Sequence, residues 1–292
     1  MNRICSAIFS RDLIGEVLGT FALVLFGCGS VAVSVLFGAH QGLMQVALAW
    51  GLGVTLAIYM TRHLSCAHLN PAVSLAMVVS GRMRYRKLPG YLCAQLAGAV
   101  LAGLALYLLF GPSIAAYESA HQIVRGSPES VRTAMMFGEY YPNPGGSAVV
   151  SLPLAMGAEA FGTFLLVLMI FALTEGCNVG RPDNALAPLF IGLTVTSIIC
   201  LLAPLTQAGL NPARDLGPRL VAWLMGWGDA AFPDRVGGFF HVYVLAPLAG
   251  GVLAARFFVG VIEPAMKDQS SVSACCDNQS RPSAGNDSCQ QS

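Results

Sequence analysis

Residues 67–74 read AHLNPAVS and residues 209–219 read GLNPARDLGPR, so the tripeptide Asn-Pro-Ala occurs twice in the chain. A second pair of similar segments lies upstream of these, GEVLGTFALVL at 15–25 and AEAFGTFLLVL at 158–168. The same motifs in the same order in each half are the signature of an internal repeat. The sequence therefore predicts a duplicated chain.

The composition excludes several classes of protein. Hydrophobic residues make up 55% of the 292 residues and charged residues 11%, and the mean hydropathy is +0.65. Soluble domains carry roughly 25% charged residues, so a soluble enzyme is not expected. The net charge of +1 provides no basic field for nucleic acid. The nine cysteines form no CxxC or Cys/His spacing, and no nucleophile–base pair or phosphate loop is evident. We therefore expect no metal, no cofactor and no enzymatic activity.

The apolar segments predict the fold class. A helix needs about 20 apolar residues to cross a bilayer core. Two apolar segments, about 66–80 and 209–226, are shorter than this, carry a proline near their starts, and read as re-entrant half-helices. The prediction is an all-α membrane protein with six transmembrane helices and two half-helices. The predicted spans are approximately 12–37, 41–61, 88–110, 152–174, 186–206 and 239–262.

Basic residues predict the orientation. They lie before the first span, after the first half-helix and after the last span, which six spans would place on one side. Because basic loops stay on the cytoplasmic side, both termini are predicted to be cytoplasmic and the loop 111–151 to lie outside. Residues 268–292 are polar without an apolar period, and we predict a disordered tail. We expect no function for its Cys275-Cys276 pair; the alternatives are that the pair is acylated or binds a soft metal. The basic residues are Arg3, Arg11, Arg82, Arg84, Arg86, Lys87 and Lys267.

The repeated tripeptide has a specific chemistry at the start of a short buried helix. Asparagine is a favoured N-cap and proline is tolerated at the first helical position. With three spans per repeat the second copy must be inverted, so the two half-helices meet with their positive ends at the bilayer centre. The amides of Asn70 and Asn211 would then donate to a polar solute, while cations are repelled. The residues involved are Asn70, Pro71 and Ala72 in the first copy and Asn211, Pro212 and Ala213 in the second.

The two motifs and the repeat resemble the aquaporin superfamily (major intrinsic proteins). The resemblance covers about residues 10–265, with one repeat over about 10–110 and the other over about 152–265. It implies a right-handed aquaporin-like bundle over 1–267 that forms a homotetramer in which each protomer has its own pore. Asp215 after Arg214, Arg219, and the outer segment Tyr140-Tyr141-Pro142-Asn143-Pro144 look like the glycerol-facilitator branch.

The family's selectivity filter maps onto Trp50, Ile199, Ala208 and Arg214. Glycerol facilitators typically have an aromatic, a glycine, a second aromatic and the arginine at these places. Strict water channels typically have Phe, His, a small residue and Arg. Here the histidine and the second aromatic are absent, and the set looks most like that of plant nodulin-26-like channels. Trp50 and Ile199 would form an apolar wall for a CH backbone, opposite the donors of Arg214.

By the same resemblance, backbone carbonyls continue the pore. They would come from Cys66, Ala67 and His68 on one side and from Gln207, Ala208 and Gly209 on the other. Cys66 and Gln207 replace glycines that are usual there, and each side chain either packs away from the pore or faces it.

Three acidic residues are assigned to loop support. Intramembrane carboxylates are functional candidates by default. The resemblance implies that Glu16 and Glu159 accept backbone N–H bonds from the re-entrant loops, with proton relay as the alternative, and that Asp215 has a similar supporting role.

The predicted function is a passive channel for glycerol and other small uncharged solutes in a plasma membrane, or in the inner membrane of a bacterium. The alternatives are a channel mainly for water or neutral metalloids such as arsenite, and a proton-coupled secondary transporter, since transporters also use inverted repeats.

Overall fold

The computed structural model describes residues 10–40, 42–232 and 238–267, and this part of the chain is helical with no strand. Within it, six helices are long and apolar enough to cross a membrane, as predicted. The first five contain α2 (Arg11–Phe37), α3 (Leu43–Thr61), α5 (Leu88–Ala120), α7 (Leu152–Thr174) and α8 (Ala187–Thr206). The sixth runs from Gly238 to Lys267 through α10 (Gly238–Phe240), η5 (His241–Leu245), α11 (Ala246–Phe257), η6 (Phe258–Ile262) and α12 (Glu263–Lys267).

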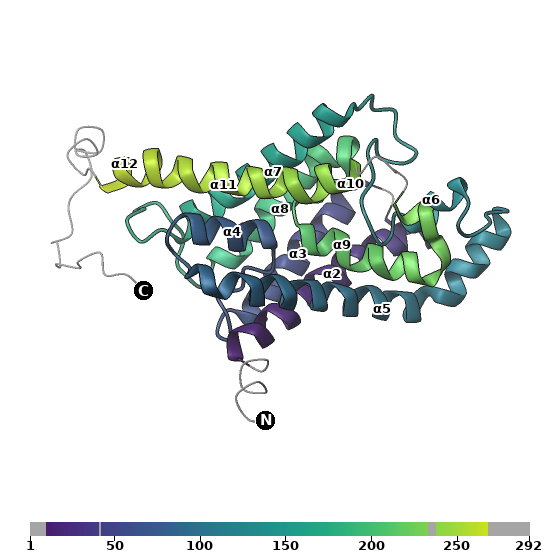
Figure 1. Ribbon diagram of the computed structural model, residues 1–292, viewed down its shortest axis with the longest axis horizontal. Helices are drawn as coiled ribbons and strands as arrows, with labels where there is room; N and C mark the ends of the chain where they lie inside the picture. Colours follow the sequence, from purple (N-terminus) through teal and green to yellow (C-terminus); the bar gives the residue numbers. More distant parts are fainter. Residues whose placement is uncertain (1–9, 41, 233–237, 268–292) are drawn as a thin grey trace.

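The two predicted half-helices are α4 (Pro71–Val79) and α9 (Pro212–Ala222). Both begin where the sequence predicts, because an asparagine caps each one. The Oδ1 atom of Asn70 accepts from the N–H of Ala72 at 2.8 Å. In Figure 1, α4 and α9 lie between α11 and α5, one beyond the other along the long axis of the molecule. The predicted fold class is confirmed.

Helix α5 is longer than predicted. The sequence predicts that this span ends near residue 110, whereas the helix continues through Pro112 to Ala120. The extension is stabilised by a tertiary contact, since the buried carboxylate of Glu118 accepts from Arg125 Nη2 and the Thr133 hydroxyl, both at 2.8 Å. The outer segment that supplies these donors holds the short helices η2 (Pro128–Ser130) and α6 (Val131–Ala134).

Helices α3 and α8 cross at a very short distance. A Cβ atom on Gly51 would lie 2.5 Å from the carbonyl oxygen of Gly192, and one on Gly192 would lie 2.3 Å from that of Gly51. Thr55 and Thr196 fill the matching places beside each glycine, with hydroxyls that donate to carbonyls of the opposite helix. This pairing relates an element of the first half to its counterpart in the second half, as an internal repeat requires.

One end of the molecule collects charged side chains. Arg82, in the segment after α4, pairs with Glu175 at 2.5 Å and with Glu263 at 3.3 Å. Lys87, near the 3₁₀ turn η1 (Tyr85–Lys87), pairs with Asp12 at 2.8 Å. The start of α2, the basic segment and the end of the last helix therefore share one end, as the orientation argument assumed. The predicted disordered tail at 268–292, with Cys275 and Cys276, and the basic Arg3 lie outside the described residues.

Candidate solute pathway

The two half-helices are joined where their asparagines meet. Asn70 Nδ2 donates to the carbonyl oxygen of Leu210 at 3.0 Å, and Asn211 Nδ2 donates to that of Leu69 at 2.8 Å. The sequence predicts that both amides donate to a solute, whereas in the structure one N–H of each donates to a carbonyl of the opposite loop. A primary amide has two N–H groups, so each asparagine has a second donor. Both positive helix ends lie at this junction.

Glu16 supports the loop that precedes α4. Its Oε1 atom accepts from the Ser65 hydroxyl at 2.8 Å and from the N–H of His68 at 3.0 Å. Its Oε2 atom accepts from the N–H of Leu69 and from Gln95 Nε2, both at 2.7 Å. The carboxylate is fully buried, and these four donors supply the hydrogen bonds that a buried charge needs.

Glu159 supports the loop that precedes α9 in the same way. It accepts from the Thr206 hydroxyl at 2.6 Å and from the N–H groups of Gly209 at 2.9 Å and Leu210 at 2.7 Å. The Tyr243 hydroxyl also braces this loop by donating to the Thr206 carbonyl at 3.0 Å. In this structure both intramembrane carboxylates therefore accept hydrogen bonds from the loops that precede the half-helices.

Both loops adopt a backbone that non-glycine residues rarely take. Ala67 and Leu69 have φ values of +50° and +53°, and the matching Ala208 and Leu210 have +58° and +56°. Gln207 also has a left-handed φ of +62°. Such residues cost about 1–3 kcal/mol each and persist only where the surroundings enforce them. The bonds from Glu16 and Glu159 supply that enforcement.

His68 belongs to a polar network that the second half lacks at the matching place. Its Nδ1 atom lies 3.2 Å from the Ser74 hydroxyl, and Gln95 Nε2 donates to the same hydroxyl at 2.9 Å. The imidazole also packs against Tyr91, with ring centroids 5.2 Å apart. The side chain thus braces the α4 loop.

The four residues assigned to the filter include an aromatic–cation pair. The Cζ atom of Arg214 lies 3.9 Å from the centroid of the Trp50 ring. The ring also lies against Gly27, where an added Cβ atom would come 2.0 Å from the Trp50 Cε3 atom. Ile199 and Ala208 are also buried, at 4% and 2% exposed. The guanidinium therefore covers the tryptophan in this structure.

Glu139, which lies in the outer loop 111–151, is a site residue that was not assigned to the pathway from the sequence. Its carboxylate forms a buried ion pair with Arg214 Nη1. The two residues are far apart in the chain and no local motif links them, so no sequence signal indicated the contact. This partner neutralises a guanidinium that would be costly inside a membrane.

Two buried side chains, those of Asp215 and Arg219, hold the backbone of Glu139 in place. Its backbone N–H donates to Asp215 Oδ1 at 2.7 Å, and its carbonyl accepts from Arg219 Nη2. Arg219 in turn pairs with Asp215 at 2.7 Å and is 1% exposed. Asp215 therefore supports the outer segment, through the Glu139 backbone and Arg219.

The side chain of Gln207 connects the loop before α9 to the outer segment. Its Oε1 atom accepts from the N–H of Tyr140 at 2.7 Å, while the Tyr140 hydroxyl donates to the Ala230 carbonyl at 2.8 Å. Burial raises the pKa of Tyr140 to about 12, which keeps this donor protonated. The Gln207 side chain thus anchors the outer segment and also lines a cavity.

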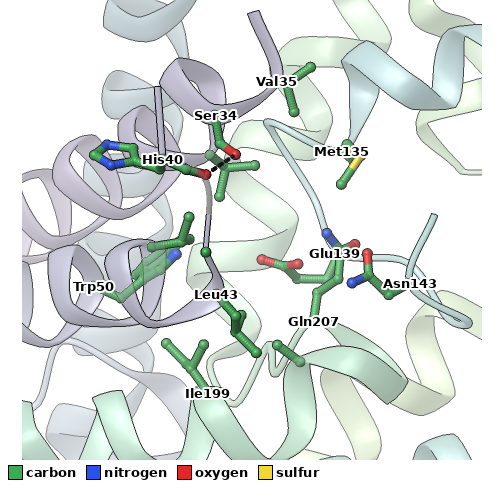
Figure 2. Close-up of a pocket in the computed structure, with 14 residues that line it drawn as sticks. Ser34, Val35, His40, Leu43, Trp50, Met135, Glu139, Asn143, Ile199 and Gln207 are labelled. Carbon is green, nitrogen blue, oxygen red and sulfur yellow. Dashed lines mark hydrogen bonds between the residues drawn. The ribbon is translucent and has the colours of Figure 1, made fainter. Parts of the chain in front are cut away.

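The cavity has a volume of about 290 Å³. Trp50, Ile199 and Gln207 line it together with Glu139 and Asn143, and Figure 2 shows these side chains around one common space. This volume is enough for a small polyol with some water, since one water occupies about 30 Å³ of liquid. The cavity leads to the assigned filter from the side opposite the charged end.

Comparisons with known proteins agree with this geometry. Residues 3–258 match the family model described as "Major intrinsic protein". The chain belongs to the major intrinsic protein family. It is 42% identical to a propanediol uptake facilitator of Citrobacter freundii, over 85% of this chain and 91% of that protein. It is 42% identical to a glycerol uptake facilitator protein of Pseudomonas aeruginosa, over 83% and 85% of the two chains.

Solved structures also include a similar protein. The aquaglyceroporin from Plasmodium falciparum has a TM-score of 0.76 and 29% sequence identity, and the match covers 88% of this chain and 98% of that one. The resemblance stated from the sequence is confirmed, and the chain is a multi-pass membrane protein of the major intrinsic protein family.

Gln207 and Cys66, which stand where glycine is usual in major intrinsic proteins, differ in how their side chains are placed. Gln207 directs its side chain to the outer cavity and to Tyr140. Cys66 is an exposed free cysteine, and whether it faces the lumen stays a prediction. Among the described residues no group of three or more His, Cys, Asp or Glu side chains is arranged to hold a metal.

Proposed function

We propose that this protein is a passive channel for glycerol and other small uncharged solutes that excludes protons and ions. The observation that carries the proposal is the pair of half-helices that meet at Asn70 and Asn211. Two positive helix ends and two amide donors at one point favour a neutral acceptor over a cation. The printed names of the relatives, which include glycerol and propanediol facilitators, support the same class of solute.

The proposed pathway has three parts. A solute enters the cavity near Glu139, passes the filter of Trp50, Ile199, Ala208 and Arg214, and then reaches the asparagine pair. Because Arg214 lies on the face of Trp50, a passing solute takes the place of the guanidinium against the ring. Further on, carbonyls of the two strained loops supply acceptors.

The intramembrane carboxylates act as loop supports in this proposal, not as proton carriers. Glu16 accepts four hydrogen bonds and Glu159 accepts three. Protonation would break a bond that each loop needs, so cycles of proton uptake and release would disturb the pathway. We infer that the protein is not an enzyme, because it belongs to the major intrinsic protein family and its relatives are named as uptake facilitators.

The assembly and location follow from the same proposal. We infer a homotetramer in a plasma membrane, or in the inner membrane if the source is bacterial, with both termini on the cytoplasmic side. The support for the orientation is the basic segment at the charged end, where Arg82 and Lys87 lie. We infer that membrane lipid and the neighbouring protomers together cover the exposed apolar residues, among them Leu108, Leu201 and Leu253.

Stopped-flow light scattering on proteoliposomes tests the proposal. We expect glycerol entry well above that of protein-free vesicles, and rising in proportion to the glycerol concentration, as for a channel. Rapid water flux without glycerol entry would replace this function by that of a water channel, and neutral arsenite and urea would then be tested. Entry that saturates at low glycerol concentration would favour a transporter.

A further inference from the structure

The basic segment between α4 and α5 is held against the protein at both of its ends. Near its start, Arg82 pairs with Glu175 at 2.5 Å, and the backbone N–H of Arg82 donates to the Met77 carbonyl at 2.9 Å. At its end, Lys87 pairs with Asp12 at 2.8 Å. Two of its cationic side chains are therefore used within the protein, and they fix the position of the residues between them.

The two basic residues between these anchors, Arg84 and Arg86, are exposed. Neither forms an ion pair with a carboxylate of the described residues. The Nε atom of Arg86 donates to the Tyr85 hydroxyl at 3.3 Å, and its Cζ atom lies 5.8 Å from the centroid of that ring. Two positive charges, two residues apart in a fixed segment, are thus available to an anion from outside the chain.

An apolar surface begins beside these charges. Tyr85 is 68% exposed, and exposed tyrosines are typical of the level of the lipid headgroups. The exposed side chains that follow along the first half of α5 recur every four residues, so they lie on one face of the helix. They are Pro89, Cys93, Ala97 and Leu101. The combination of two guanidinium groups and an adjoining apolar face suits a ligand with an anionic head and a hydrocarbon chain.

We propose that Arg84 and Arg86 bind the phosphate group of an anionic phospholipid whose acyl chains lie along the exposed face of α5. Guanidinium groups donate paired hydrogen bonds to phosphate oxygens. A basic residue near the membrane surface adds about fivefold to the affinity for anionic lipid. The site is separate from the solute pathway, so it goes beyond the proposed function and does not depend on it.

Native mass spectrometry of the purified protein, titrated with lipid, tests the proposal. Phosphatidylglycerol is compared with phosphatidylcholine of the same acyl chains, because the choline group cancels the phosphate charge. We expect the first phosphatidylglycerol to bind at least about tenfold more tightly than phosphatidylcholine, since two basic residues contribute. Equal affinities of the wild-type protein for the two lipids would overturn the proposal.

Three variants locate the binding. The double variant Arg84→Gln/Arg86→Gln should lose about tenfold or more in affinity for phosphatidylglycerol and keep its affinity for phosphatidylcholine. The double variant Arg84→Lys/Arg86→Lys keeps both charges and should lose less than about threefold. Arg132→Gln is the matched control, because Arg132 is an exposed arginine of the outer segment, and it should bind both lipids as the wild type does. An unchanged affinity for phosphatidylglycerol in the glutamine variant would overturn the proposal.

Two further measurements separate the possible explanations. Soluble glycerol 3-phosphate, added at the same concentration as the lipid, should leave phosphatidylglycerol bound; displacement would show a site for free phosphate and overturn the assignment to lipid. Elution of each variant from a sizing column at the wild-type volume shows that a lower affinity does not come from misfolding. Absence of glycerol flux in the wild type, with lipid binding as expected, would overturn the proposed function and support this site independently.

Discussion

Removal of the Glu159 carboxylate is expected to disable the second half of the pathway. In Glu159→Ala, the N–H groups of Gly209 and Leu210 lose their acceptor, and the Thr206 hydroxyl loses its partner. A buried donor left without a partner costs about 1–3 kcal/mol. The two backbone groups therefore cost about 2–6 kcal/mol, less the relief of burying one fewer charge.

We expect a net loss of about 2–4 kcal/mol in the free energy of unfolding. The left-handed residues Ala208 and Leu210 would relax, and Asn211 would lose its position. Glycerol flux should then fall to the level of protein-free vesicles. Unfolding in mixed micelles with increasing SDS measures the first quantity, and proteoliposome uptake measures the second.

Two further variants give this test its control. Glu159→Gln keeps one acceptor oxygen, so it should retain measurable flux and lose less stability than the alanine variant. Glu129→Ala changes an exposed carboxylate of the outer segment and should change neither quantity. Wild-type stability and flux in Glu159→Ala would refute the support role. Normal stability with flux that no longer responds to a proton gradient in Glu159→Gln would favour the relay alternative.

Three other contacts give further predictions. Arg214→Val removes the filter cation and leaves the buried carboxylate of Glu139 unpaired, so leakage of cations into vesicles, measured with a fluorescent dye, should rise. An unchanged ion barrier would place all exclusion of ions at the asparagine pair. Gly192→Ala puts a Cβ atom 2.3 Å from the Gly51 carbonyl oxygen and should lower the free energy of unfolding by about 1–3 kcal/mol or more. The control Gly157→Ala has open space around its Cβ position and should be neutral, so equal unfolding curves for the two variants would contradict the close crossing of α3 and α8. Because Cys66 is exposed, a charged thiol reagent should label it in inverted vesicles and should slow glycerol flux if the thiol lines the lumen; labelling without any change in flux would place the thiol outside the pathway.

The elements that the sequence predicted well are those with local signals. The spans are long apolar runs, and α4 and α9 begin where an asparagine cap and a proline occur together. The repeat also predicted that Glu16 and Glu159 occupy equivalent places. These features depend on near neighbours in the chain or on the duplication itself, so the sequence alone carries them.

The features that were missed depend on contacts between distant segments. Helix α5 continues to Ala120 because Glu118 finds partners in the outer segment. The Glu139–Arg214 pair joins a loop to a half-helix, and neither composition nor periodicity records which loop carboxylate reaches the guanidinium. Likewise, the use of one Asn211 N–H to hold the Leu69 carbonyl emerges only when both loops are in place.

The central claim is that neutral solutes cross this protein passively at a junction that protons do not cross. The most direct measurement follows glycerol entry and internal pH together in one set of proteoliposomes, with and without an imposed proton gradient. The account predicts rapid glycerol entry at the same rate under both conditions, and a proton leak equal to that of protein-free vesicles. Glycerol entry that requires the gradient, or that carries protons with it, would contradict the account.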